Sequence, residues 1–385
     1  RNSLSLLIII FTLASNLFFI ACQENDVLPP IENPGDFIGA LPQEVLYPVD
    51  NPYSPEKEHL GKLLYWDPIL SGNKDVACVS CHHPNFGYAD GLKFSQGVGA
   101  RQLGPNRSGG LQTRRNSPTV INTAFNGIDT NGIYQPESAP MFWDNRALSL
   151  EQQALLPMLS KEEMRGEEIA EAVIMDTLVQ RLSSIPAYLD LFEAAFGSQE
   201  INQTRVLAAI ATFERGIIAN NSRFDQYMRG DLSAMTDYEV LGMNTFIQVG
   251  CADCHSGPMF SDYELHTLGV RDNISPPDQG ATNNFDFRTP TLRNLKLTAP
   301  YMHNGLYNSL EEVMDFYEDV AEGDDEERNI NLSQDQLAED MQDLELEDDQ
   351  IDEILAFLQT LNDENFDRSI PGSVPSGLAV GGNIE

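Results

Sequence analysis

The sequence predicts a mainly α-helical protein of two domains with long loops. Apolar residues recur at helical spacing in residues 203–219 and 350–361, and no stretch alternates apolar and polar residues convincingly over the length of a strand. Loops rich in Gly, Pro and Asn interrupt the helices, for example residues 97–116 and 126–140. Two closely similar cysteine motifs, far apart in the chain, indicate a related unit in each domain.

The chain begins with an apolar run that is too short for a membrane stop-transfer span and is flanked like a secretory h-region. Residues 1–22 are therefore interpreted as a signal peptide and left out of the fold. Cys22 lies where a bacterial lipoprotein is cleaved and acylated, although Phe19 is not the usual residue of that motif. A plain cleavable signal with an unpaired Cys22 is the alternative. Residues 23–45 are rich in proline and are expected to form a flexible, extended tether.

The two cysteine motifs read CVSCH at residues 78–82 and CADCH at residues 251–255. Cys-x-x-Cys-His is the signature of covalent c-type haem attachment, in which two thioethers fix the porphyrin and the histidine becomes an axial iron ligand. The motifs hold four of the five cysteines. The predicted attachment residues are Cys78, Cys81 and His82 for the first haem c and Cys251, Cys254 and His255 for the second.

Other uses of paired cysteines explain the motifs less well. A zinc site built from two Cys-x-x-Cys units leaves the histidine after each pair unexplained, and the long separation fits a compact zinc knuckle poorly. A thioredoxin-like redox pair is expected after an apolar strand that opens a βαβ unit, and neither motif follows one. Because haem c is attached outside the cytoplasm, the motifs agree with the signal peptide and predict a periplasmic protein of the cell envelope.

After the predicted tether, about 340 residues remain, which is enough for two domains of ordinary size. We predict two cytochrome c-like haem domains, residues 46–225 and 226–366, followed by a C-terminal tail, residues 367–385. In such domains the porphyrin supplies much of the core, so long loops around it are expected.

The formal net charge of −36 makes nucleic acid an improbable partner. It favours either simple solubility or a basic redox partner. Acidic residues crowd between residues 311 and 353, which we interpret as a solvated surface first and a docking face second.

The reaction depends on the sixth position of each iron, because an open iron binds peroxide whereas a closed one mainly transfers electrons. Four histidines remain outside the motifs: His59, His83, His266 and His303. His83 follows His82 directly and is not expected to reach the opposite face of the same haem. Each of the others could be a ligand, a propionate partner or an ordinary polar residue, and spacing does not choose among them.

Further segments carry a resemblance to a known family. They are RNSPTV at residues 115–120, FWDNRA at 142–147, PTLRN at 290–294 and LTAPYMHNG at 297–305. Together with the two motifs, over about residues 55 to 365 and in the right order, they resemble the bacterial di-haem cytochrome c peroxidase and MauG family. The resemblance implies a peroxidatic first domain and an electron-transfer second domain.

The resemblance also implies roles for single residues. Trp143 is similar to the tryptophan between the haems, Gln153 and Glu163 to the polar pair above the peroxide-binding iron, and Pro157 to the proline of that pocket. Oxygens of Asn116, Thr298 and Pro300 are similar to those that hold a calcium ion between the domains. Taken singly, Gln153 and Glu163 would most often be exposed helix residues and Trp143 a core residue. A carboxyl group such as Glu163 can move protons during peroxide cleavage, whereas Gln153 can only position it.

Two positions depart from the peroxidase pattern. Val98 stands where many peroxidases of the family have a histidine that blocks the peroxide site until the other haem is reduced. The first haem is therefore expected to be open at rest. Tyr317 stands where those peroxidases have the methionine ligand of the second haem, as in MauG-like members; Met314 and Met302 are the rival ligands.

From these positions we predict an enzyme, a haem-dependent peroxidase that reduces hydrogen peroxide with electrons from an envelope donor such as a small cytochrome c. The resemblance implies that the oxidising equivalents are shared through Trp143 as a bis-ferryl-like state. One alternative is MauG-like oxidation of a residue in a partner protein, although Val249 replaces the surface tryptophan that MauG uses. Another is a non-enzymatic electron-transfer cytochrome, against which Gln153, Glu163 and Val98 argue.

Overall fold

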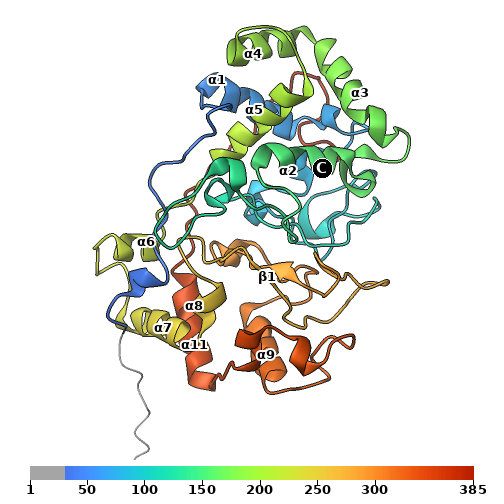
Figure 1. Cartoon of the computed structure of the whole chain (residues 1–385). Coiled ribbons are helices and arrows are strands. Elements are labelled where there is room, and N and C mark those ends of the chain that lie inside the picture. The colour runs from blue at the N-terminus through green and yellow to red at the C-terminus, as the bar shows by residue number, and fades with distance from the viewer. Residues whose placement is uncertain (1–30) are drawn as a thin grey trace, which may run out of the picture.

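The computed structural model describes residues 31–385 and is mainly helical, which confirms the predicted class (Figure 1). The predicted signal peptide, its Cys22 and the first part of the predicted tether lie outside the described residues. The α-helices are α1 (Pro55–Trp66), α2 (Leu150–Leu159), α3 (Glu171–Ser183), α4 (Pro186–Phe196), α5 (Gln203–Arg215), α6 (Arg223–Met228), α7 (Asp237–Gln248), α8 (Cys251–Cys254), α9 (Leu310–Ala321), α10 (Glu339–Gln342) and α11 (Asp348–Gln359). Within residues 31–385 the strands are β1 (Leu265–His266) and β2 (Phe287–Arg288), which pair antiparallel.

The first half of the molecule, in the upper part of Figure 1, is built around the contact between α1 and α5. Ser54 starts α1 by accepting a hydrogen bond from the backbone N–H of Lys57, and Pro55 occupies the first helical position. The two helices meet at Gly61, where a Cβ atom would lie 1.9 Å from the carbonyl oxygen of Ala209. Only glycine therefore permits this crossing.

The second half repeats this arrangement with α7 and α11. Thr236 and Glu239 form a capping box at the start of α7. The helices meet at Gly242, where a Cβ atom would lie 1.9 Å from the carbonyl oxygen of Glu353. In each half, the helix that precedes the cysteine motif crosses a later helix at a glycine. The two cysteine motifs therefore follow equivalent helices in the two halves.

Both helices predicted from apolar periodicity are present, as α5 and α11. The first ends at Arg215 and not at residue 219. Beyond it the chain is extended, and Asn122 fixes it by exchanging two 2.8 Å hydrogen bonds with the backbone of Ala219. The residues after the helix stay buried although they are no longer helical, because Ile217 enters a hydrophobic core.

Residues 31–45 are packed, so the prediction of a flexible tether is wrong for this part of it. Ile38 is 1% exposed and Leu41 2% exposed. The backbone N–H of Leu41 donates to Asp225 Oδ1 at 2.9 Å, and Arg293 Nη2 donates to the carbonyl oxygen of Gly39 at 3.2 Å. Asp225 and Arg293 form a fully buried ion pair at 3.0 Å, which anchors the segment on the second half.

The ends of the first half also differ from the predicted boundaries. The boundary at residues 225 and 226 falls inside α6, whose Phe224 packs in the core of the second half. The first half therefore ends before α6. The C-terminal tail returns to the first half, where Ser376 Oγ donates to Asp67 Oδ1 at 2.6 Å and Gly381 donates to the carbonyl oxygen of Trp66 at 2.8 Å.

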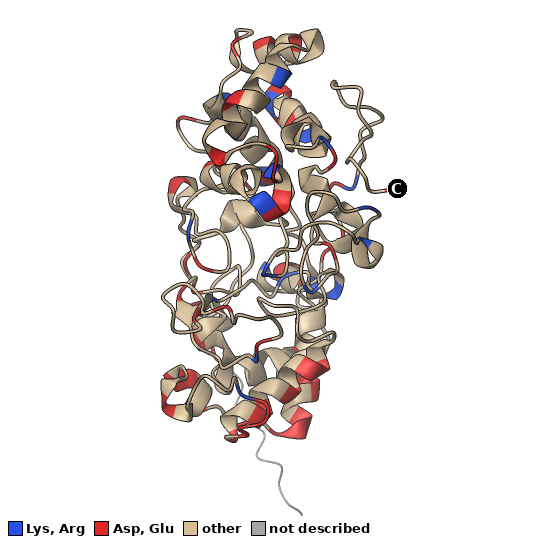
Figure 2. Ribbon diagram, turned by 90° about the vertical axis from the view of Figure 1, so that its right-hand side faces the viewer, with Lys and Arg blue, Asp and Glu red and all other residues tan. Residues whose placement is uncertain are grey.

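Acidic residues of α9 and α11 gather at the lower end of the molecule (Figure 2). They belong to the acidic region predicted to be a solvated surface, and many of them are exposed.

Among residues 31–385, no helix has the length and apolar character needed to span a membrane.

Candidate functional site

Two cavities are lined by one cysteine motif each. The motif residues in their walls are Cys78, Cys81 and His82 in the first cavity and Cys251, Cys254 and His255 in the second. Trp143 lines both cavities, and its Nε1 donates to the backbone oxygen of Asn116 at 2.9 Å. The indole is therefore part of the wall that the cavities share.

Each motif folds as a single helical turn. The backbone N–H of His82 donates to the carbonyl oxygen of Cys78 at 3.0 Å, and that of His255 donates to Cys251 at 2.9 Å. One turn brings the two cysteines and the following histidine of each motif to the same cavity. This arrangement fits thioether attachment of a porphyrin with the histidine beneath it.

The two motif histidines are oriented by backbone carbonyl groups. His82 Nδ1 donates to the oxygen of Tyr88 at 3.0 Å, and His255 Nδ1 donates to that of Phe260 at 3.0 Å. Tyr88 and Phe260 both adopt a positive φ, 56° and 55°, which is unusual for aromatic residues. Burial lowers the pKa of both imidazoles, so each keeps a neutral Nε2 that can bind iron.

The four motif cysteines are partly buried. None of the four forms a disulfide. Burial raises the pKa of Cys81 and of Cys251 to about 12 and that of Cys78 further still. No cluster among the described residues joins both motifs around one metal ion, so the structure does not support the zinc alternative.

Three predicted residues of the peroxide pocket line the first cavity together. Gln153 and Pro157 are four residues apart on α2 and share one of its faces. Glu163 follows on a π-helical turn, Lys161–Arg165. Burial raises the pKa of the Glu163 carboxyl, and Arg146 acts in the opposite direction. A polar amide and a carboxyl that holds its proton more tightly than usual therefore face the same space.

The loop that carries Val98 is fixed to this pocket. Val98 is buried in the core of the first half, and its backbone N–H donates to the carbonyl oxygen of Glu163 at 3.0 Å. At Gly97 a Cβ atom would lie 1.9 Å from the carbonyl oxygen of Glu162. The side chain of Arg107 also fixes the loop, because its Nε donates to the carbonyl oxygen of Gln96 at 2.7 Å.

In the second cavity, Tyr317 and both rival ligands, Met314 and Met302, are among the lining residues. Burial raises the pKa of Tyr317. Tyr317 as the iron ligand stays a prediction.

The remaining histidines have different surroundings. His59 is exposed. His83 is buried beside Trp66, and its Nδ1 accepts a hydrogen bond from the backbone of Asn85. His303 lies in the wall of the second cavity and stacks on Phe287 with 3.6 Å between ring centroids.

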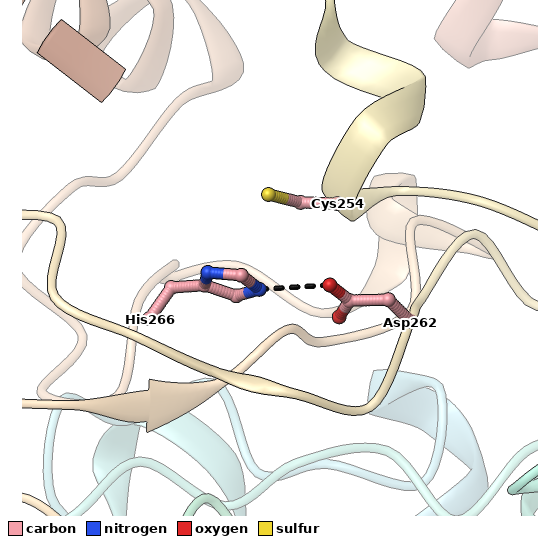
Figure 3. A group of neighbouring side chains, drawn as sticks. All are labelled: Cys254, Asp262 and His266. Carbon is pink, nitrogen blue, oxygen red and sulfur yellow. Dashed lines mark hydrogen bonds and ion pairs between the residues drawn. The ribbon is translucent and has the colours of Figure 1, made fainter. Parts of the chain in front are cut away.

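His266 belongs to a group that sequence reasoning did not assemble. Its Nε2 bonds to Asp262 Oδ2 at 2.7 Å, and Cys254 lies beside the pair (Figure 3). The hydrogen bond that His266 Nε2 donates to the Asp262 carboxylate, together with the neighbouring Cys254, raises the pKa of His266 to about 10. Asp262 and His266 are four residues apart, and this spacing is the signal in the sequence that could have identified the pair. Such a trio could hold a metal ion, but a Cys254 thioether would remove its thiolate.

The three predicted calcium ligands, Asn116, Thr298 and Pro300, all line the second cavity. The backbone N–H of Asn116 donates to the oxygen of His303 at 2.7 Å, and its side-chain amide donates to the oxygen of Leu92 at 2.8 Å. Asn116 therefore ties together segments from both halves. Calcium binding there stays a prediction.

The chain is similar to known proteins along most of its length. Residues 55–233 match the family described as di-haem cytochrome c peroxidase. The chain is 35% identical to the methylamine utilization protein MauG of Methylorubrum extorquens, over 84% of this chain and 83% of that protein. It is 34% identical to the cytochrome-c peroxidase IdrP1 of Pseudomonas sp. strain SCT, over 83% and 84%. A crystal structure of a MauG-like protein associated with microbial copper homeostasis superposes with a TM-score of 0.68, at 28% identity, over 89% of this chain and 95% of that one.

Proposed function

The chain belongs to the di-haem cytochrome c peroxidase and MauG family, and we propose that it reduces hydrogen peroxide to water with electrons from a redox protein of the cell envelope. Family membership makes it an oxidoreductase and implies two haem c groups. The observation that carries the proposal is the position of Trp143 in a wall shared by two cavities that each contain a Cys-x-x-Cys-His turn. Electrons that enter at one cavity can therefore reach the other.

In the proposed assignment, Cys78, Cys81 and His82 hold the first haem and Cys251, Cys254, His255 and Tyr317 hold the second. The haems supply the electron-transfer chemistry when bound. The overall reaction joins peroxide, two electrons and two protons to give two waters. Glu163 takes the proton from one peroxide oxygen and returns it to the other, and Gln153 orients peroxide by hydrogen bonding. Pro157 contributes an apolar wall.

We propose further that the first haem is open at rest. Val98 cannot bind iron, and its loop is held by the backbone of Glu163 and by Arg107. An anaerobic titration of the diferric protein with peroxide, without reductant, tests both proposals. A rapid change of the Soret band is expected. A reaction that begins only after one haem is reduced would contradict the open site, and no reaction in either state would leave an electron-transfer cytochrome.

A MauG-like activity is the second candidate, because relatives named MauG are among the similar proteins. The substrate would then be an oxidisable residue of a partner protein. Val249, at the end of α7, stands where the resemblance places the surface tryptophan of MauG, which disfavours that partner. Mass spectrometry of exported proteins after peroxide treatment distinguishes the candidates, since a peroxidase leaves its donor chemically unmodified.

We also propose a calcium ion between Asn116, Thr298 and Pro300. Removing it with a chelator is expected to change the spectrum of the second haem and to slow electron transfer between the haems, because these residues line the second cavity and Asn116 contacts Trp143. Readding calcium should restore both properties. Metal analysis that finds no calcium in the purified protein would refute the site.

The proposed location is the periplasm, with a lipid anchor at Cys22. Mass spectrometry of the mature N-terminus tests this proposal. An acylated Cys22 is expected, and an unmodified terminus would leave a plain secreted protein.

A further inference from the structure

Glu214 is a buried carboxyl group in the wall of the first cavity that the proposed function does not use. It lies near the end of α5, is 5% exposed and lines the same cavity as Cys78. Its Oε2 is buried and has no hydrogen-bond partner among residues 31–385. Leaving such a group unpaired is costly, so it needs an explanation.

The guanidinium group of the neighbouring Arg215 forms an ion pair with another acid, Glu151. Arg215 Nη1 and Nη2 donate to the two carboxylate oxygens of Glu151 at 2.5 and 2.9 Å. Glu151 also accepts a 2.7 Å hydrogen bond from Asn51. Because Glu151 and Arg215 neutralise each other, Glu214 is an additional acid without its own counter-ion. A buried acid in that position is most stable with its proton bound.

Electrostatics agree with this geometry. Burial raises the pKa of Glu214 to about 8; Arg215 lowers it and Glu151 raises it again. The titratable and charged groups around it are Arg215 on α5, Glu151 on α2, Tyr65 on α1 and Cys78 on the motif turn. A thioether at Cys78 cannot ionise, so attachment of the haem leaves Glu214 as the exchangeable acid at this edge of the cavity.

We propose that Glu214 binds a proton when the first haem is reduced and releases it when that haem is oxidised. The inference rests on the proposed attachment of a haem at Cys78 and Cys81. One electron from the envelope donor converts ferric to ferrous iron, and one proton from solvent converts the Glu214 carboxylate to the carboxylic acid. The added electron favours the bound proton because the two charges interact strongly inside a buried site.

This role differs from that of Glu163. Glu163 moves a proton that peroxide already carries, whereas the reaction consumes two further protons. Glu214 instead exchanges a proton with solvent when the oxidation state of the haem changes, and peroxide is not its partner. The linkage is reciprocal: if reduction raises the proton affinity of Glu214, protonation raises the reduction potential of the haem.

The test is a redox titration of the intact di-haem protein between about pH 6 and about pH 10, with the first haem followed by its own spectrum. In the wild-type protein the midpoint potential is expected to fall as the pH rises through about 8. In Glu214→Gln this slope is expected to disappear. Glu162→Gln, which removes an exposed carboxyl of the same cavity, should keep it.

A potential that does not depend on pH in the wild-type protein, or a slope that survives in Glu214→Gln, would overturn the inference. If Glu214→Gln fails to fold, the infrared difference spectrum of the reduced and oxidised wild-type protein decides. It should contain a carboxylic acid carbonyl band that shifts in D₂O, and its absence overturns the inference. Haem content and the peroxide reaction are also measured on the wild-type protein, where absence of the first haem would instead refute the proposed function.

Discussion

Glu163→Gln is expected to slow the reaction of the diferric protein with peroxide by about 10²- to 10⁴-fold, the usual contribution of a general acid–base group. Gln cannot take a proton from peroxide, although it has nearly the same shape. Because burial raises the pKa of Glu163, the wild-type rate should rise with pH as the carboxyl loses its proton. Stopped-flow measurements of the Soret band across pH test both statements, and the rate of the variant should not follow that titration.

Glu162→Gln is the matched control, since Glu162 is exposed on the same π-helical turn as Glu163. It should react at the wild-type rate. Both variants should retain two haems, measured by the pyridine haemochrome assay. A Glu163→Gln protein with unchanged kinetics would remove Glu163 from the acid–base role and leave proton transfer to water.

Tyr317→Met is expected to raise the reduction potential of the second haem by on the order of 0.1 V or more, because axial ligands set haem potentials over a wide range. A phenolate is a hard, anionic donor that favours oxidised iron, whereas a thioether favours reduced iron. The ligand-sensitive absorption and electron paramagnetic resonance signals of this haem should change as well. The first haem should keep its spectrum, since Tyr317 does not line the first cavity.

Met314→Leu separates the candidates, because Met314 lines the second cavity from the same helix, α9. Its removal should leave the spectrum of the second haem unchanged if Tyr317 is the ligand. The opposite pattern, in which Met314→Leu alters the spectrum and Tyr317→Met does not, would assign the ligand to Met314.

Local patterns allowed several features to be predicted from the sequence. The helices α5 and α11 follow from apolar periodicity, because a helix with one apolar face is stable wherever that face can be buried. The turns that contain the cysteine motifs could also be predicted, because the two cysteines and the histidine of each motif lie within five consecutive residues.

Features that depend on distant partners could not be predicted in this way. Residues 31–45 have the proline content of a linker, yet Asp225 and Arg293 bind their backbone from much later in the chain. No pattern in the sequence distinguishes Glu214. Its burial follows from the packing of α5 against α1 and α2, and its lack of a counter-ion follows from the pairing of Arg215 with Glu151.

The sequence by itself therefore determined the class of chemistry, because covalent haem attachment is encoded in two short motifs. The tertiary structure decided which residues surround each motif. It placed Trp143 in the wall of both cavities and brought Gln153, Glu163 and Glu214 to the first of them. The physical reason is that these contacts join helices and loops far apart in the chain, and their geometry depends on how the cores pack.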